Sequence, residues 1–299
     1  MDQRRRIGAY GVCRDGERVL LVRGAAGADF PEAWQLPGGG LEHGEHAEVA
    51  VVREVAEETG LTVTVAGLRD AVADVTRYPE LDVALHTDRI IFDVTPTGGT
   101  LRDAAAGTTD RAGWFTPAEA AGLPLLPFTA ELLGLPATPL PARAGREPFG
   151  PAPTDRRQRF AAYGLVTDPA GRVLLTMIAN GYPGAGKWHL PGGGTDHGEQ
   201  PAAGLLRELV EEAGQLGRVV DLLAVDNLHN PAALGPERRP LDWHAVRVIY
   251  RVRVDAPTEA VVTELAGGST ARAAWFAPEQ VSGLWLTDVA RLATGRRGR

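Results

Sequence analysis

The sequence predicts an α/β fold that occurs twice in the chain. The chain has 299 residues, a length that suits two domains better than one. Residues 34–45 read WQLPGGGLEHGE and residues 188–199 read WHLPGGGTDHGE, an offset of 154. Each block lies between predicted strands and a predicted helix, and such an order is typical of layered α/β domains. Because self-similarity at this distance indicates duplication, we expect two domains of one architecture.

The boundary between the copies falls in a proline-rich stretch. Residues 138–157 contain five prolines and show no apolar periodicity, which favours an extended linker. We therefore predict an N-terminal domain at residues 1–137 and a C-terminal domain at residues 158–299. Later repeats drift to offsets of 158 and 161, as in the recurrence of Trp114-Phe115 as Trp275-Phe276, which places insertions in loops of the second copy.

Each copy predicts the same elements in the same order. Strands are expected at residues 7–13 and 160–167, followed by apolar strands at 19–22 and 173–176. A loop rich in Gly, Pro and Trp then leads into a helix, and further strands and a closing helical stretch complete the copy. Arg4 to Arg6 are interpreted as a solvated lead-in, and Cys13 as a half-buried strand residue.

Composition and charge exclude several classes of protein. The chain is 44% hydrophobic and 23% charged, which argues against a wholly disordered protein. Its net charge of −7 disfavours a polynucleotide partner. No apolar run approaches the roughly 20 residues of a membrane helix, so no membrane association is expected. The single cysteine excludes an internal disulfide and is compatible with a cytoplasmic location.

The predicted helix at residues 46–59 carries an unusual acidic face. It lacks Pro and Gly and stops at Gly60. At about 100° per residue, Glu54, Glu57 and Glu58 share one face. The expected core-facing stripe consists of Val49, Val52, Val55 and Ala56, and in the second copy of Ala203, Leu206, Leu209 and Val210.

The three glutamates need a compensating charge, because like charges at this spacing destabilise a helix. A solvated acidic face is the alternative, but the same carboxylates recur at the same offset after the same glycine triplet. Clustered carboxylate oxygens suit Mg²⁺ or Mn²⁺. The glycines at 38–40 and 192–194 allow the backbone to approach a metal ion or a phosphate closely.

These residues spell a known pattern. The first copy matches every defined position of the Nudix box, which here consists of Gly39, five residues, Glu45, seven residues, and the segment REVAEETGL at 53–61. The second copy matches from Gly193 onward, except that Gln215 replaces the final apolar residue. The chain thus resembles two MutT-like Nudix hydrolases in tandem over nearly its whole length. The resemblance implies two α/β/α sandwich domains, each with a mixed β-sheet and a loop-helix catalytic motif.

The resemblance also implies an activity and roles for the box residues. The activity is hydrolysis, by metal-activated water, of a diphosphate linkage in a nucleoside diphosphate derivative such as a nucleoside triphosphate or a nucleotide sugar. The implied Mg²⁺ or Mn²⁺ ligands are Gly38 through its carbonyl, Glu54, Glu57 and Glu58, and in the second copy Gly192, Glu208, Glu211 and Glu212. Alternatively, Glu54 and Glu208 are the bases that activate water. The implied role of Arg53 and Arg207 is to orient the glutamates. The implied role of Glu45 and Glu199 is to support the loop or the metal.

Other residues are candidates for substrate contact. These are Arg23, His43, His86 and Arg89 in the first copy, and His197, His244 and Arg247 in the second. Alternatively, His86 and Arg89 form a structural pair, as do their counterparts His244 and Arg247, and this explains their recurrence equally well. Asp110 fits a further acidic ligand or base, whereas no carboxylate lies between Ser269 and Trp275 and Glu264 is a distant substitute. We therefore expect the second copy to be slower or to take another substrate.

Three hypotheses remain open at this point. The first is a Mg²⁺-dependent diphosphatase that acts on a small-molecule substrate with at least one working site. The second is a nucleotide-binding module that does not cleave its ligand. In the third, the first copy is catalytic and the second serves binding or intramolecular pairing, and a homodimer is also compatible. The pattern leaves the substrate open, non-nucleotide prenyl diphosphates included.

Overall fold

Each copy folds around a mixed β-sheet, as the sequence predicts. The computed structural model describes residues 1–104, 107–140, 155–234, 240–263 and 268–295. The chain divides into two units, Met1–Arg157 with His229–His244, and Gln158–Leu228 with Ala245–Arg299. Most of the predicted linker, residues 141–154, lies outside the described residues. Thr138 still bonds the first domain, because its Oγ1 accepts from the Leu125 amide at 3.2 Å and donates to the Leu123 carbonyl at 2.8 Å.

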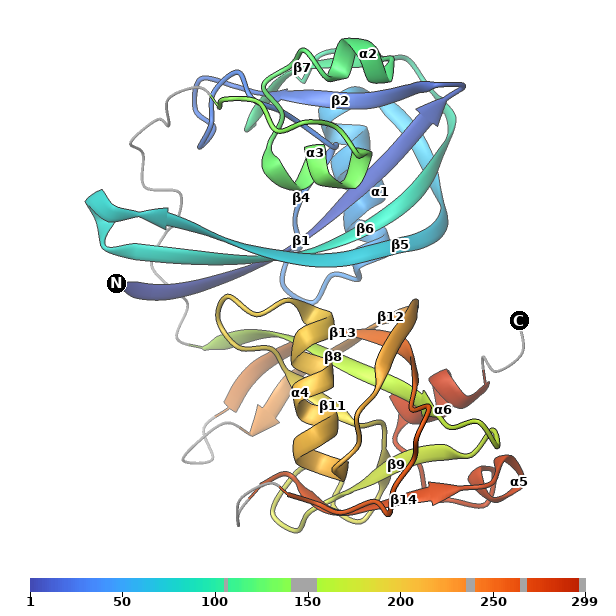
Figure 1. Ribbon diagram of the computed structural model, residues 1–299. Helices are drawn as coiled ribbons and strands as arrows, with labels where there is room; N and C mark the ends of the chain where they lie inside the picture. The colour runs from blue at the N-terminus through green and yellow to red at the C-terminus, as the bar shows by residue number, and fades with distance from the viewer. Residues whose placement is uncertain (105–106, 141–154, 235–239, 264–267, 296–299) are drawn as a thin grey trace. The chain divides into compact units, whose positions relative to one another are not determined.

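The first copy contains seven strands and three α-helices within the described residues (Figure 1). They are β1 (Asp2–Asp15), β2 (Arg18–Gly24), β3 (Trp34–Gln35), β4 (Gly38–Gly40), α1 (Ala47–Thr59), β5 (Leu61–Tyr78), the 3₁₀ turn η1 (Pro79–Leu81), β6 (Val83–Gly99), β7 (Thr109–Phe115), α2 (Pro117–Ala120) and α3 (Pro127–Leu133).

The second copy repeats this order, apart from the 3₁₀ turn, in the part of the chain that is described. Its elements are β8 (Arg156–Thr167), β9 (Val173–Ile178), β10 (Trp188–His189), β11 (Gly192–Gly194), α4 (Pro201–Ala213), β12 (Arg218–Leu234), β13 (Pro240–Arg253), β14 (Thr270–Phe276), α5 (Pro278–Val281) and α6 (Asp288–Gly295). The duplication inferred from the repeated block therefore extends to the secondary structure.

The sheet brings the glycine triplet beside the first strand of each copy. The strand order is β3-β2-β1-β6-β5, with β4 paired to β1 and β7 to β2. Strand β1 runs parallel to β6 and antiparallel to β4, so that Gly38 lies opposite Tyr10. The second sheet has the order β10-β9-β8-β13-β12, and there Gly192 lies opposite Tyr163.

Alternate residues of β1 face different layers. Tyr10 and Val12 belong to a buried cluster that includes Phe128 of α3. On the other face, a Cβ at Gly11 would lie 3.3 Å from a methyl group of Val51 in α1. Because side chains alternate along a strand, β1 serves both layers at once. Figure 1 shows α1 and α3 with the sheet of the first copy between them, as expected for an α/β/α sandwich.

The predicted helix bounds are confirmed, but the predicted core stripe is only partly right, because Val55 and Leu209 are buried whereas Val49 and Val210 are not. His46 is the N-cap of α1, and its side chain accepts from the Glu48 amide. Val49 is 58% exposed and Val210 is 39% exposed. The buried positions are Ala47, Ala50, Val51, Val55, Glu58 and Thr59 in α1, and Pro201, Gly204, Leu205, Leu209, Glu212 and Ala213 in α4. The stripe keeps helical spacing but includes the last glutamate, because that carboxylate has hydrogen-bond partners inside the fold.

Two smaller predictions about β1 are also corrected. Arg4 to Arg6 are not a lead-in, because β1 already begins at Asp2 and pairs with β6 along its length. Cys13 is fully buried rather than half-buried. Burial raises the pKa of its thiol to about 11, so the thiolate is disfavoured at pH 7.

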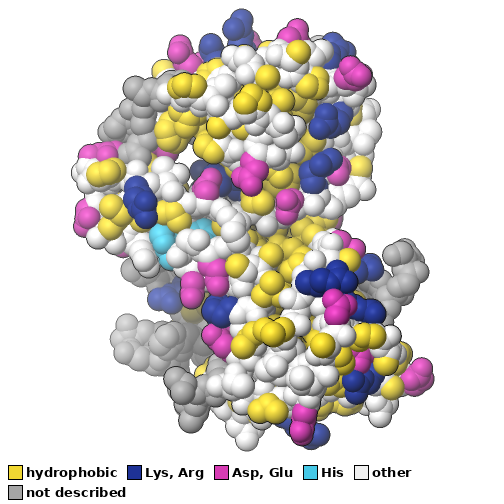
Figure 2. Space-filling view, viewed as in Figure 1, with side chains coloured by type: hydrophobic (Ala, Val, Ile, Leu, Met, Phe, Trp, Pro, Cys, Tyr) yellow, Lys and Arg dark blue, Asp and Glu magenta, His cyan; other side chains and the backbone are white. Residues whose placement is uncertain are grey.

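The surface shows mixed charge. On the face in Figure 2, acidic and basic side chains are interspersed with apolar and neutral ones, and no broad basic area is seen among the described side chains. Among the described residues, no helix combines the length and apolarity that a bilayer crossing requires.

Candidate active site

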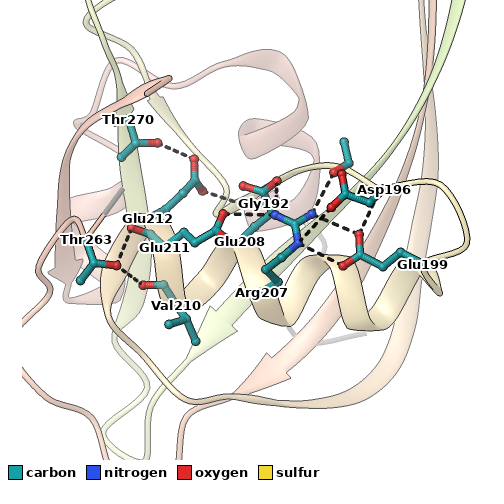
Figure 3. A network of polar contacts seen from close by, with 11 residues as sticks. Gly192, Asp196, Glu199, Arg207, Glu208, Val210, Glu211, Glu212, Thr263 and Thr270 are labelled. Atoms are coloured by element: carbon teal, nitrogen blue, oxygen red, sulfur yellow. Dashed lines mark hydrogen bonds and ion pairs between the residues drawn. The ribbon is translucent and has the colours of Figure 1, made fainter. Parts of the chain in front are cut away.

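The glycine strands bring a backbone amide to the last glutamate of each box. Gly38 has φ 145°, and a Cβ there would lie 2.3 Å from the Ala9 carbonyl oxygen, so only glycine fits. The Gly38 amide donates to Glu58 Oε2 at 2.9 Å. In the second copy, the Gly192 amide donates to Glu212 Oε2 at 2.8 Å (Figure 3).

A threonine from the last strand of each sheet completes the environment of this glutamate. In the second copy, the Thr270 hydroxyl donates to Glu212 Oε1 (Figure 3). Thr109 makes the corresponding side-chain hydrogen bond to Glu58. Both glutamates are buried, with 7% and 4% exposure. The last box glutamate is therefore held by the fold on two sides rather than pointing into solvent.

The first box glutamate lies directly against the middle glycine. A Cβ at Gly39 would be 2.6 Å from the Glu54 carboxylate oxygens, and one at Gly193 would be 2.8 Å from Glu208 Oε1. Any side chain at these positions would displace the carboxylate. Glycine is thus required here for close approach of a carboxylate to the loop backbone.

An arginine joins the loop to the helix in each copy. Arg53 donates from Nε and Nη2 to the two oxygens of Glu45, at 2.9 and 2.8 Å, and from Nη1 to Glu54 Oε1 at 2.9 Å. It also bonds the Gly40 carbonyl at 3.2 Å. Arg207 repeats these contacts with Glu199 and Glu208 (Figure 3). It also donates to the Gly194 carbonyl at 3.3 Å. Such forked pairing fixes the carboxylates in place.

Two carboxylates of the first box, Glu54 and Glu58, lie in an environment that disfavours their ionisation. Burial, with smaller contributions from the charges of Glu54 and Glu57, raises the pKa of Glu58 to about 8, against the hydrogen bonds from Gly38 and Thr109. Burial also raises the pKa of Glu54, although Arg53 opposes this. The expected compensating charge is thus supplied in part by Arg53. Carboxylates whose ionisation is disfavoured by burial and by each other fit a divalent cation, since it would stabilise their charged forms.

A cavity of about 610 Å³ opens beside the first box. The box residues Gly38, Gly39 and Glu54 form part of its wall, and Arg89 forms another part. This volume lies within the usual range of small-molecule sites, about 300 to 1,000 Å³. The remaining polar or aromatic residues in its wall are Arg6, Tyr10, Asp29, Phe30, Gln35, Thr76, Tyr78, Thr87 and Thr108.

Arg89 is the predicted substrate residue that the structure brings to this cavity. Its guanidinium lies 4.3 Å from the Phe128 ring centroid and pairs with Asp74 at 2.8 Å. The side chain is only 8% exposed. Its Nε makes no hydrogen bond among the described residues. A buried donor that lines a cavity is suited to a polar ligand.

The other candidates of the first copy lie elsewhere. Arg23 is engaged by Asp110, to which it donates at 2.9 and 3.1 Å, so the two side chains neutralise each other. His86 is fully buried, and its Nε2 lies 3.1 Å from Asp88 Oδ1, the arrangement of a structural pair. His43 lies in the loop before α1, where its Nε2 is 3.1 Å from Asp242 Oδ1.

The candidates of the second copy are also distributed. His197 lies half-buried in the loop before α4. His244 is fully buried, and its Nδ1 accepts from the Gly44 amide at 3.1 Å. Arg247 pairs with Asp226, its Nε donating to Oδ2 at 2.6 Å. Glu264 lies outside the described residues.

The departure from the box pattern at Gln215 is accommodated by hydrogen bonds. The side chain is 1% exposed. Its amide donates to the Ala213 carbonyl and to Thr258 Oγ1 at 3.0 and 2.9 Å, and it accepts from the Thr258 amide at 3.0 Å. Leu61, the apolar counterpart, is 7% exposed. A satisfied buried amide thus replaces a packed side chain at the same place.

Sequence reasoning missed two groups of site residues that repeats could have revealed. Arg6 and Tyr10, both in the cavity wall, belong to a pattern R-x-x-A-Y-G that recurs at residues 159–164. Thr109 and Thr270 belong to T-x-R-A-x-W-F, which recurs at an offset of 161. Both patterns lie in strands outside the box, where only the comparison of the two copies marks them.

Fold and site define a two-domain protein in which each domain carries one carboxylate-rich loop-helix site. The family profile of the NUDIX domain matches residues 2–133 and 157–294. The chain therefore belongs to the Nudix family and contains two Nudix domains.

Curated relatives match parts of the chain. A MutT-like protein of Streptomyces ambofaciens is 38% identical over 108 residues, 36% of this chain and 61% of the relative. An ADP-ribose pyrophosphatase of Methanocaldococcus jannaschii is 33% identical over 96 residues, 32% and 54% of the two chains. A putative 8-oxo-dGTP diphosphatase of Bacillus subtilis is 35% identical over 108 residues, 36% and 62%. Each match spans less than two thirds of the relative's length.

Solved structures also resemble the chain. A MutT Nudix hydrolase from Burkholderia pseudomallei matches with a TM-score of 0.39 and 24% identity, over 44% of this chain and 97% of that one. A MutT protein from Methanosarcina mazei matches with a TM-score of 0.38 and 21% identity, over 48% and 95%.

Proposed function

We propose that the chain hydrolyses a diphosphate linkage in a nucleoside diphosphate derivative, with a divalent cation as cofactor. The observation that carries this proposal is the cavity of about 610 Å³ whose wall combines Glu54 and the glycine loop with the cations Arg6 and Arg89. A substrate whose diphosphate binds beside Glu54 and whose polar group binds beside Arg89 would contact both parts of the cavity wall.

The donor set fits the cofactor. Mg²⁺, or Mn²⁺ in its place, would be held by carboxylate oxygens of the box, with Glu57 and Glu58 in the first copy and Glu211 and Glu212 in the second. The carbonyls of Gly38 and Gly192 would add a backbone oxygen to each set. A bound divalent cation supplies charge neutralisation on phosphate oxygens and lowers the pKa of a bound water.

The residues of the chain divide the remaining work. Glu54 accepts the proton of the attacking water, a role that suits a carboxylate whose pKa burial has raised. Arg53 holds Glu54 in place through its 2.9 Å hydrogen bond. Arg6 attracts the phosphate groups, since phosphoryl transfer depends on neutralising their oxygens. Arg89 donates to the far end of the substrate and contributes to specificity.

The names of the relatives guide the choice of substrates. ADP-ribose and 8-oxo-dGTP, named for two of them, both contain a nucleoside linked through a diphosphate. A hydrolysis screen with these two compounds, nucleotide sugars, dinucleoside polyphosphates and a prenyl diphosphate would test the proposal. We expect metal-dependent release of a phosphomonoester from a nucleotide member. Turnover of the prenyl compound alone would contradict the nucleotide class.

The second copy has a site that differs near the box, which favours a division of labour. Gln35 lines the first cavity. The ring centroid of its counterpart, His189, lies 4.7 Å from that of Tyr163, and His189 Nδ1 lies 2.7 Å from Thr287 Oγ1. We propose that the first copy carries the main activity. If so, Glu58→Gln removes turnover of the preferred substrate while Glu212→Gln leaves it. Equal losses in the two variants would show that both sites work on it.

A further inference from the structure

Three side chains that Nudix chemistry does not use converge within the first unit. His43 comes from the loop before α1, His229 from β12 and Asp242 from β13. The Nε2 atoms of His43 and His229 lie 3.1 and 2.8 Å from Asp242 Oδ1. The three ligand atoms all lie within 4.8 Å of one another. Among the described residues, no other group of at least three His, Cys, Asp or Glu side chains has ligand atoms this close.

These separations match those around a tetrahedral zinc ion. Zn²⁺ binds imidazole nitrogen and carboxylate oxygen at about 2.0 to 2.1 Å, so neighbouring ligand atoms of a tetrahedron lie about 3.3 Å apart. Two of the three separations, 3.1 and 2.8 Å, are already near this value. Only the distance between the two imidazole nitrogens remains to be set by the ion.

A second observation points to a ligand rather than to a closed polar cluster. His43 Nε2 is buried and makes no hydrogen bond, although Asp242 Oδ1 is within 3.1 Å. The His43 side chain is 13% exposed. A buried imidazole nitrogen aimed at a carboxylate without hydrogen-bond geometry is costly in itself, and a cation placed between them would remove that cost.

A third histidine packs beside the three side chains. His244 lies with its ring centroid 5.4 Å from that of His43, and its Nδ1 accepts from the Gly44 amide at 3.1 Å. This hydrogen bond fixes the backbone next to His43.

We propose that His43, His229 and Asp242 bind a zinc ion, separately from the box carboxylates. Two imidazoles and one carboxylate suit Zn²⁺, whereas Mg²⁺ prefers oxygen ligands alone. The ion would join the loop that carries Glu45 to those parts of β12 and β13 that belong to the first unit. Asp242 has Ala84 as its counterpart at the offset of 158. Because Ala84 offers no ligand atom, one ion per chain is expected.

The test uses the full chain, stripped of metal and titrated with ZnCl₂ by isothermal calorimetry in excess Mg²⁺. We expect one equivalent of Zn²⁺ that Mg²⁺ does not displace. His229→Ala weakens binding tenfold or more, because loss of even an outer-shell partner of a metal site costs 10- to 100-fold. His197→Ala, in the equivalent loop of the second copy, is the matched control and binds Zn²⁺ as the native chain does.

Zinc K-edge X-ray absorption gives a readout that does not depend on affinity. The expected spectrum shows nitrogen and oxygen neighbours at about 2.0 to 2.1 Å, with the outer-shell signal of imidazole. Asp242→Asn keeps the size of the side chain and should therefore preserve the fold. It should also weaken Zn²⁺ binding. The proposal is overturned if Zn²⁺ fails to bind in excess Mg²⁺. It is equally overturned if His229→Ala binds normally or if Glu58→Gln abolishes binding instead.

Discussion

Replacement of Glu58 by glutamine should stabilise the metal-free protein while it removes catalysis. The carboxyl is 7% exposed and accepts from the Gly38 amide at 2.9 Å. Glutamine has the same shape, and its amide oxygen can accept the same bond. The substitution therefore removes a carboxyl that must take up a proton to be buried at pH 7, and it leaves the packing in place.

The size of the effect follows from the pKa. The folded chain raises the pKa of Glu58 from 4.5 to about 8, so at pH 7 the carboxyl is protonated when folded and ionised when unfolded. A raised carboxyl pKa contributes stability below the unfolded pKa, and that contribution is lost as the pH rises towards the folded pKa. At pH 7, about 2.5 units above the unfolded pKa, and about 1.36 kcal/mol per unit, the loss is about 3 kcal/mol.

The assay is urea unfolding in EDTA between about pH 5 and about pH 8.5, a range that covers most of the interval between the unfolded pKa of 4.5 and the folded pKa of about 8. We expect the native chain to lose stability across this range and Glu58→Gln to lose about 3 kcal/mol less by pH 7. Glu57→Gln is the matched control, because that side chain is 61% exposed and its contribution should stay below about 1 kcal/mol. Parallel stability profiles for the native chain and Glu58→Gln would refute the reasoning.

Two further predictions concern the loop and its arginine. Gly39→Ala should reduce kcat by about a hundredfold or more, because its Cβ would lie 2.6 Å from the Glu54 carboxylate. Gly67→Ala is the control, because a Cβ there meets nothing within 4 Å, and it should leave kcat unchanged. An unaltered kcat in Gly39→Ala would contradict the close packing of Glu54. Arg53→Lys should lower kcat tenfold or more at similar KM, since an ammonium cannot keep both hydrogen bonds to Glu45; a rise in KM alone would indicate a substrate contact instead.

The sequence was sufficient to predict the fold and the box but not the orientation of the helix. The repeat and Gly60 correctly indicated the limits of α1. The helix contains four valines and three alanines, so more than one apolar stripe can be drawn on it. The stripe that is buried includes Glu58, and hydrogen bonds from the Gly38 amide and the Thr109 side chain, on two separate strands, make that burial tolerable. No property of the helix sequence by itself reports those partners.

Substrate residues were predicted less well for a similar reason. Arg89 lines the cavity, but Arg23 is neutralised by Asp110, and the contact joins two strands that are far apart in the sequence. His86 is enclosed by the fold beside Asp88. Residue type and alternation along a strand predict on which face of the sheet a side chain lies. Whether that side chain has a structural role or binds a ligand depends on its partner from another strand.

The most direct test of the proposed activity is turnover of the nucleotide panel by the full chain with Mg²⁺, with EDTA, and in the double variant Glu54→Gln with Glu208→Gln. We predict phosphomonoester release with Mg²⁺, none with EDTA, and a loss of at least about a hundredfold in the double variant. Undiminished hydrolysis by the double variant, or no release from any member by the native chain with Mg²⁺ or Mn²⁺, would contradict the account.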